Sequence, residues 1–263
     1  MAVVPSVRPR TVTQWVLGLL AAGAVALVIG YAVRSKAPAA AVPPAQAAAA
    51  PAPAADAPLP PSAESDARVR EALSGVSPND LFHRWLASAD DLLNRLAVVA
   101  VSLSEDRSPV RELAFLRPSQ PFGAVRSGGG FVVSRRSYAR YDVFAKAIAS
   151  LDAERVAGAY KTLHPLLESA YHGLGYPGQP LDRLVARALQ RIVDAPVRER
   201  VAVQRAGSLW VFADANLETQ GGVEKQLLRM GPRNTRLVQA QAREVAQAIG
   251  LRLRGPLEAT TTR

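Results

Sequence analysis

Three polar side chains at helical spacing are the first candidates for chemistry. His164, Glu168 and His172 recur every four residues along one predicted helix. Neighbouring pairs could share a metal ion, but the two histidines lie about 12 Å apart along a helix axis, too far to bind the same ion. The chain also has no HExxH motif. We therefore interpret these residues as a solvated helix flank and predict no metal site.

Paired carboxylates are the second candidate, because two nearby acids can divide the acid and base roles of a hydrolase. Asp142 with Asp182 or with Asp214 would form such a pair. The structural alternative is more concrete. Asp182 falls in the first turn of a predicted helix, where the helix dipole stabilises a carboxylate by about 0.3–1 kcal/mol. Asp142 and Asp214 can accept hydrogen bonds from tyrosines or arginines.

We favour the structural interpretation, because tyrosines on the core side of the predicted helices, including Tyr160, need hydrogen-bond partners when buried. The predicted polar cluster, structural or partner-binding, consists of Tyr138, Arg140, Tyr141, Asp142, Tyr171, Tyr176, Asp182, Arg183 and Asp214. Within it, we expect Asp182 and Arg183 to contact Tyr141 and Arg140. No residue of the chain is predicted to be catalytic.

Other signatures of enzymes and cofactor sites are missing from the sequence. The chain contains neither GxSxG nor SxxK, the common serine nucleophile motifs. It has no cysteine, which excludes disulfides and thiolate metal sites. Gly128, Gly129 and Gly130 precede a predicted strand and lack a nearby GK[ST] motif, so we predict a hairpin turn rather than a phosphate-binding loop. We expect no cofactor.

The elements that position these residues are mainly helices, because apolar residues recur every three or four positions. The predicted helices cover residues 66–73, 77–96, 138–151, 152–173 with a kink at Pro165, 180–192, a short stretch after Asp214, 223–230 and 232–249. Ser77 and Asp152 are predicted to be helix caps. The predicted hairpins pair residues 122–126 with 131–134 and 200–205 with 208–213, and a type II turn falls at 176–179. These patterns indicate an α+β fold, predominantly α-helical, with about seven helices and two β-hairpins around one core.

An apolar run of 19 residues begins at Trp15 and ends at Val33. At about 1.5 Å per residue, such a helix nearly spans a hydrocarbon core of roughly 30 Å. Signal-peptide apolar regions are shorter, about 7–15 residues, so we predict an uncleaved transmembrane anchor. Gly18, Ala22, Ala26 and Gly30 form a stripe of small residues. Such a stripe is typical of self-associating membrane helices, although small residues are also common in any membrane helix.

The segments around the anchor give the predicted topology. Residues 1–14 form a short N-terminus, which two arginines and the amino group place weakly on the cytoplasmic side. Residues 34–61 form an Ala/Pro-rich linker, residues 62–250 the globular domain, and residues 251–263 a flexible tail. We therefore expect a single-pass protein of a bacterial inner membrane with a periplasmic domain.

The charge of the chain is strongly basic, with 32 Lys and Arg against 22 Asp and Glu. Only four of these cations are lysines. The arginines are scattered along the sequence, so we do not favour a nucleic-acid partner. A nucleic-acid or anionic-lipid binder would require them to cluster on one face of the fold.

Short motifs distributed over residues 59–249 suggest a family. They are Glu64-Ser65-Asp66 with Val69-Arg70, Tyr138-Ala139-Arg140-Tyr141-Asp142, Ala170-Tyr171 with Leu174-Gly175-Tyr176-Pro177, Asp182-Arg183-Leu184, Phe212-Ala213-Asp214, and Leu227-Leu228-Arg229-Met230-Gly231-Pro232 with Asn234. In these motifs the chain resembles the bacterial domain of unknown function family 3014. The resemblance implies membrane attachment and a proline-rich linker, but it implies no activity. Glu168-Ser169 and Leu181 depart from the family's usual residues, which argues against a chemical role for those side chains.

We therefore expect a non-enzymatic, membrane-tethered binding or scaffolding module of the cell envelope. An envelope hydrolase would instead require a deep cleft that holds an acid pair with raised pKa values. The sequence does not identify the envelope partner.

Overall fold

A computed structural model describes residues 59–60, 62–109, 111–113 and 117–254 of the chain, and within them it contains nine helices and four strands. The helices are α2 (Ser62–Leu73), α3 (Asp80–Ser88), α4 (Leu92–Ser104), α5 (Arg135–Ala139), α6 (Asp142–Ala149), α7 (Ala153–Gly173), α8 (Leu181–Asp194), α9 (Ala215–Glu218) and α10 (Gly222–Ala248). The strands are β1 (Ala124–Ser127), β2 (Gly130–Val133), β3 (Ala202–Ala206) and β4 (Leu209–Phe212). The predicted α+β, mostly helical class is confirmed.

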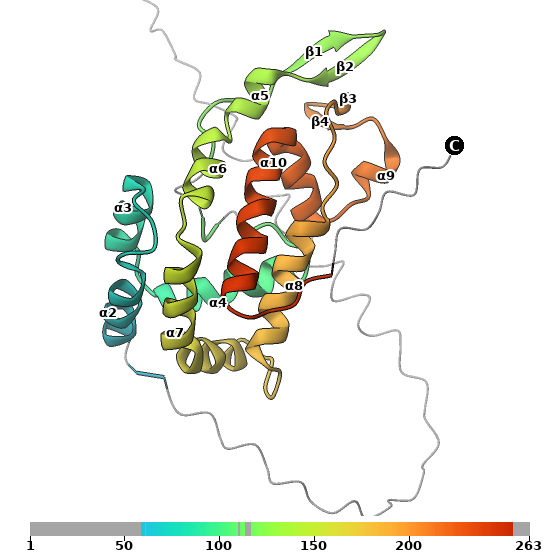
Figure 1. Cartoon of the computed structure of the whole chain (residues 1–263). Coiled ribbons are helices and arrows are strands. Elements are labelled where there is room, and N and C mark those ends of the chain that lie inside the picture. The colour runs from blue at the N-terminus through green and yellow to red at the C-terminus, as the bar shows by residue number, and fades with distance from the viewer. Residues whose placement is uncertain (1–58, 61, 110, 114–116, 255–263) are drawn as a thin grey trace, which may run out of the picture. The chain divides into compact units, whose positions relative to one another are not determined.

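The two predicted hairpins join into one antiparallel sheet with the order β1-β2-β3-β4. The join is made between β2 and β3, where Phe131 is paired with Val203. Figure 1 shows both hairpins and α5 at one end of the helical body. The sequence pattern predicts each hairpin separately and does not predict their pairing, because the residues that pair β2 with β3 are about seventy positions apart.

Three groups of buried side chains hold the domain together. The first packs α2, α4, α7 and α8 around the fully buried Tyr171 and Leu92. The second joins α6 to α10 around Ala145 and Met230. The third fixes the sheet onto α10 through Phe212 and Leu228, among others. The sheet therefore has one face on the helical body.

The predicted helix over 77–96 is wrong as a single element, because it is interrupted between α3 and α4. Asp91 adopts a left-handed φ of 57° at the junction. The buried Asp66 of α2 accepts hydrogen bonds from Asp91 N at 2.9 Å and Leu92 N at 2.7 Å. Arg70 donates to the carbonyls of Leu86 and Ala89 at the end of α3. Two side chains of another helix thus satisfy the backbone groups that the break exposes.

A second predicted helix, over 138–151, is also divided. Tyr141 separates α5 from α6 with φ −99° and ψ 1°. The predicted separation at position 231 is confirmed, because Gly231 has φ 81° and ψ 166° inside α10, far from helical values. Each of the two divided helices adds one element to the eight predicted ranges, and the ranges on either side of Gly231 are counted together as α10, which gives the nine helices of the described residues.

Local turn chemistry agrees with the sequence at several positions. The side chain of Asp152 caps α7 by accepting from Arg155 N, and Gly178, with φ 70°, follows Pro177 in the turn closed by Gln179 N and Tyr176 O. The predicted Ser77 cap is wrong. α3 begins at Asp80 and is capped by Asn79, while Ser77 Oγ bonds to Ser150 Oγ at 2.8 Å.

Several predictions fall on residues outside the described ranges. These are the anchor from Trp15 to Val33 with its stripe Gly18, Ala22, Ala26 and Gly30, nearly all of the linker, and the end of the tail. Among the residues that the structure does describe, no helix is both long and apolar enough to cross a bilayer.

Candidate functional site

A pair of carboxylates lies at the start of α10. Asp106, in the loop after α4, adopts a left-handed φ of 61°. Its Oδ1 accepts from Val223 N at 3.1 Å, and its carbonyl oxygen accepts from Gly222 N at 2.8 Å. A Cβ at Gly221 would lie 1.2 Å from Asp106 Oδ2, so only glycine leaves room for this carboxylate. Asp106 therefore caps a helix that begins more than 110 residues later.

Glu224 and Arg191 complete this charged group. Arg191 Nη1 lies 3.3 Å from Asp106 Oδ2 and 3.5 Å from Glu224 Oε1. The Glu224 side chain is 14% exposed. Burial, together with the neighbouring Asp106 carboxylate, raises the pKa of Glu224 to about 7. An acid with such a pKa can exchange protons at neutral pH, which makes this pair the best candidate for acid–base chemistry among the described residues.

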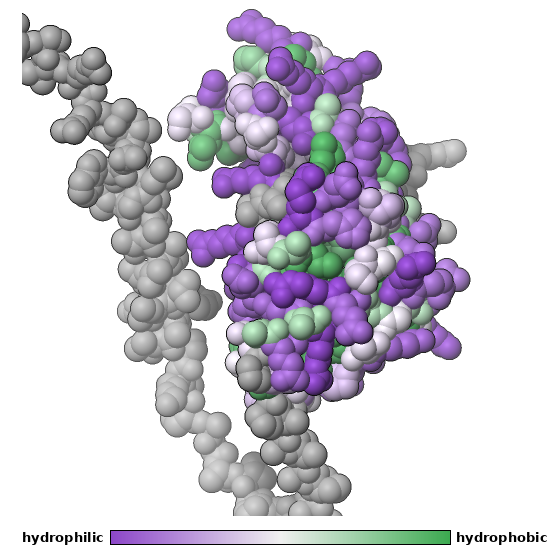
Figure 2. All heavy atoms as spheres, turned by 90° about the vertical axis from the view of Figure 1, so that its left-hand side faces the viewer, coloured by the Kyte–Doolittle hydropathy of each residue, from purple (hydrophilic) through white to green (hydrophobic). Residues whose placement is uncertain are grey.

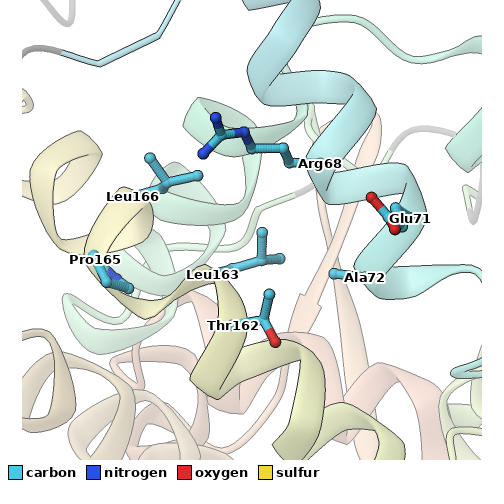
Figure 3. A pocket seen from close by; sticks show the side chains of 7 residues that line it. All are labelled: Arg68, Glu71, Ala72, Thr162, Leu163, Pro165 and Leu166. Atoms are coloured by element: carbon cyan, nitrogen blue, oxygen red, sulfur yellow. The ribbon is translucent and has the colours of Figure 1, made fainter.

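A groove with a volume of about 500 Å³ lies elsewhere in the described domain, between α2 and α7. Figure 3 shows its lining, which consists of Arg68, Glu71, Ala72, Thr162, Leu163, Pro165 and Leu166. Glu71 is the only carboxylate among these residues, so the groove does not contain an acid pair. A second hollow, of about 320 Å³, is lined by residues 126–131 at the β1–β2 turn.

Two of the family motifs meet at the break in α10. Asn234 Nδ2 donates to Met230 O, to Tyr138 O and to Asp142 Oδ1, the last at 2.9 Å. A Cβ at Gly231 would lie 2.5 Å from Cγ of Tyr138. Burial raises the pKa of the Tyr138 hydroxyl. These motif residues bind one another across the break and thereby stabilise the local structure of α10.

The predicted contact of Asp182 with Tyr141 and Arg140 is wrong. Asp182 Oδ1 accepts from the Tyr160 hydroxyl at 2.6 Å and lies 3.2 Å from His164 Nε2. Burial, and then the hydrogen bond to Asp182, raises the pKa of Tyr160. The Asp182 side chain is 57% exposed, so solvent screens the pair and loss of the carboxylate should cost less than about 1 kcal/mol.

The helix flank that we predicted to be solvated in fact binds the start of α8 and the residues just before it. His164 faces Asp182, Glu168 Oε1 accepts from Leu181 N at 3.2 Å, and His172 Nε2 lies 3.0 Å from Gln179 O. Among the described residues, no group of three or more His, Asp or Glu side chains is placed to hold a metal ion.

The remaining members of the predicted polar cluster lie at separate places. Tyr171 and Tyr176 stack with centroids 5.0 Å apart, and the Tyr176 hydroxyl donates to Glu105. The Arg140 guanidinium lies over the Tyr141 ring at 5.2 Å. Asp214 caps α9, and Arg183 follows Asp182 in the first turn of α8. The structure thus divides the cluster among the α7–α8 corner, the α10 break and the sheet.

The arginines that are scattered in the sequence gather around the sheet. We define the sheet lobe as residues 117–140 and 198–212. It contains one acid, Glu199, and the eight arginines Arg117, Arg126, Arg135, Arg136, Arg140, Arg198, Arg200 and Arg205. The rest of residues 62–254 holds nineteen basic and nineteen acidic residues. The sheet lobe therefore carries the whole charge excess of the domain.

These arginines are available to a partner. All except Arg140 are exposed, and none of the eight forms an ion pair within the described part of the chain. Glu199 is paired with Arg236 of α10. The two acids that follow the lobe are also engaged, since Asp214 caps α9 and Glu218 bonds to Phe212 N and Lys225. In Figure 2 the upper end of the domain, where Figure 1 places the hairpins, is mostly hydrophilic with apolar side chains between.

The sequence patterns missed both the acid pair of Asp106 and Glu224 and the arginine cluster of the sheet lobe. Asp106 lies outside all the predicted helices and hairpins, and nothing local connects it with Glu224 or Arg191. The sheet lobe did leave a signal, because residues 113–141 contain five arginines and no acid. Only the β2–β3 pairing brings that stretch together with the second arginine-rich hairpin.

The comparisons with known proteins agree with the motifs. A family model described as "Protein of unknown function (DUF3014)" matches residues 92–246, which is more than half of the chain. The chain belongs to this family. No curated protein and no solved structure matches it.

The DUF3014 match begins at Leu92, the first residue of α4, although the folded domain begins earlier. Val69 of α2 is fully buried in the core that α4 and α7 share. Asp66 and Arg70 hold the α3–α4 junction. Here α2 and α3 thus extend the DUF3014 core at its N-terminal side.

Proposed function

We propose that this DUF3014 protein is a non-enzymatic binding or scaffolding module, tethered to a bacterial inner membrane by residues 15–33, with its domain in the periplasm. The anchor proposal rests on the apolar run, on the Trp15 and Tyr31 side chains near its ends, and on the basic residues that flank it. The Ala/Pro-rich linker that follows is typical of a spacer between a membrane helix and an exported domain.

The observation that carries the binding role is the unpaired charge of the sheet lobe. Eight arginines stand against one glutamate that is already bound to Arg236. Like charges at one end of a small domain repel one another, so such a cluster is costly unless an anion neutralises it. We therefore propose that the lobe binds an anionic partner.

The charged groups that could do chemistry support a non-enzymatic role. Asp106 and Glu224 are engaged by the first turn of α10 and by Arg191. The groove between α2 and α7 is lined by other residues. The acid pair therefore lies apart from this groove, whereas a hydrolase needs an acid pair inside its cleft.

Protease accessibility tests the topology. Protease added to spheroplasts should digest a C-terminal tag on the full chain, and a cytoplasmic reporter serves as the protected control. Digestion of the tag only after membrane lysis would place the domain in the cytoplasm and would contradict the periplasmic proposal.

Crosslinking in cells tests the binding role. A photoreactive residue at Ser208, in the exposed β3–β4 turn, should give partner adducts, whereas the same residue at Ser88, exposed at the end of α3, should give few. Adducts concentrated at Ser88, or equal yields at the two positions, would contradict a partner site on the sheet lobe.

A further inference from the structure

We infer that the partner of the sheet lobe is the surface of an anionic phospholipid bilayer. This inference rests on the proposed function that the lobe binds an anion. It adds the chemical class of that anion and the way in which the lobe meets it.

The two faces of the sheet differ in what they contact. Val133, Val203 and Phe212 are buried against the helical body. Side chains alternate between faces along a strand, so the register places Val125, Val132, Val211 and Leu209 on the opposite face. Val125 is 51% exposed and Leu209 is 68% exposed. Apart from Ser127 and Gln204, the outward face is therefore aliphatic and partly open to solvent.

Exposed arginines lie beside this apolar face and next to the turns of both hairpins. Arg200 donates to Ser127 Oγ, and Ser127 shares the outward face with Val125. Arg126 and Arg205 are paired with Phe131 and Trp210 on the opposite face, and both lie next to the hairpin turns. Exposed aliphatic side chains with guanidinium groups beside them and at the hairpin turns match a bilayer interface, where aliphatic groups enter the acyl boundary and guanidinium groups bind lipid phosphates.

The aromatic side chains of the lobe argue against single-stranded nucleic acid as the partner. Binding of a single strand uses aromatic rings on which bases stack. Here Phe131 and Trp210 pack against each other at 5.2 Å and lie only partly exposed. Their rings are also covered by arginines, with Arg126 over Phe131 at 5.6 Å and Arg205 over Trp210 at 4.6 Å. The exposed hydrophobic side chains of the lobe, Val125 and Leu209, are aliphatic instead.

The test uses the full chain in lipid nanodiscs and exploits its lack of cysteine. A Ser208→Cys variant carries a polarity-sensitive fluorophore at the lobe, and a Ser88→Cys variant carries the same label on the helical body. Nanodiscs contain either phosphatidylcholine alone or phosphatidylcholine with phosphatidylglycerol. We expect the emission at position 208 to rise roughly twofold or more only with phosphatidylglycerol, to fall with added salt, and to stay unchanged at position 88.

Matched charge variants locate the effect. Arg126→Gln, Arg200→Gln and Arg205→Gln together should abolish most of the lipid-dependent rise. Arg155→Gln, Arg183→Gln and Arg187→Gln remove the same charge from exposed positions of the helical body and should leave it intact. Circular dichroism of each variant shows that the fold is retained. An equal loss in both sets would overturn the assignment to the lobe.

A polyuridylate arm in neutral nanodiscs separates the two levels of the proposal. A response at position 208 to this RNA, without any response to phosphatidylglycerol, would overturn the lipid inference and retain an anion-binding lobe. No response to either probe would overturn both.

Discussion

Single residues of this domain are constrained mainly by backbone geometry and burial. Gly231 has a backbone conformation that is essentially restricted to glycine. The Tyr138 ring also occupies the space that a Cβ at this position would need. Glu224 combines burial with a neighbouring carboxylate. Both positions belong to α10, and each leads to a measurement on the purified domain.

Gly231→Ala should lower the free energy of unfolding by about 2 kcal/mol or more, because the new Cβ would lie 2.5 Å from the Tyr138 ring in a strained conformation. Gly250→Ala is the matched control, since Gly250 also has a positive φ, of 78°, but a Cβ at this position would meet no other atom within 4 Å. Urea unfolding measures both. Equal losses would show that the contact with Tyr138 is unimportant.

Glu224 predicts a pH dependence of stability. Its pKa is about 7 in the folded domain, against a usual value of 4.5. Between these values the folded state keeps a proton that the unfolded state has released, so the free energy of unfolding should fall as the pH rises from about 4.5 to 7. We expect a loss of about 1–2 kcal/mol over this range.

The variant Glu224→Gln should flatten this pH profile, whereas Glu154→Gln, at an exposed position of α7, should not change it. Chemical unfolding at a series of pH values gives the comparison. A profile of Glu224→Gln that keeps the wild-type slope would assign the titration to another group.

At the scale of the elements, side chains from distant parts of the chain decide where helices begin and end. Asp66 binds the first amides of α4, and Asp106 binds those of α10. Local patterns predicted the helical content, the hairpins, the Asp152 cap and the break at Gly231, because neighbouring residues decide these features. The same patterns missed the interruption before Leu92, because its cap comes from Asp66 in another helix.

The candidate sites also depend on contacts between residues that are far apart in the sequence. The sequence supplied the correct residue types for a polar network, but it assigned Asp182 to the wrong neighbours, because Tyr160 and His164 reach it from the adjacent helix. The acid pair of Asp106 and Glu224 exists only after α4 and α10 have packed. No spacing within the sequence predicts that Asp106 and Glu224 lie close together.

Asp66→Ala should destabilise the domain by about 2–4 kcal/mol, because it leaves the buried N–H of Leu92 and the partly buried N–H of Asp91 without acceptors. Asp90→Ala, one residue before the junction and exposed, should cost less than about 0.5 kcal/mol. Thermal unfolding measures both. A small loss for Asp66→Ala would mean that the junction between α3 and α4 is held by packing alone.

At the scale of the whole molecule, the described domain separates structure from binding. The helical body has balanced charge and internal ion pairs, whereas the sheet lobe has unpaired arginines and exposed aliphatic groups. With the proposed anchor in the same chain, binding of the lobe to a second site becomes an intramolecular event, which raises its effective concentration. A moderate affinity of the lobe would then suffice.

Hydrogen–deuterium exchange of the full chain tests the binding role of the sheet lobe without any added label. The chain is compared in nanodiscs excised from native membranes and in a neutral detergent. We expect slower exchange in native membranes at residues 122–133 and 198–212, with no change in α2 or α7. Protection confined to the groove between α2 and α7, or no difference anywhere in the domain, would contradict a binding role for the sheet lobe.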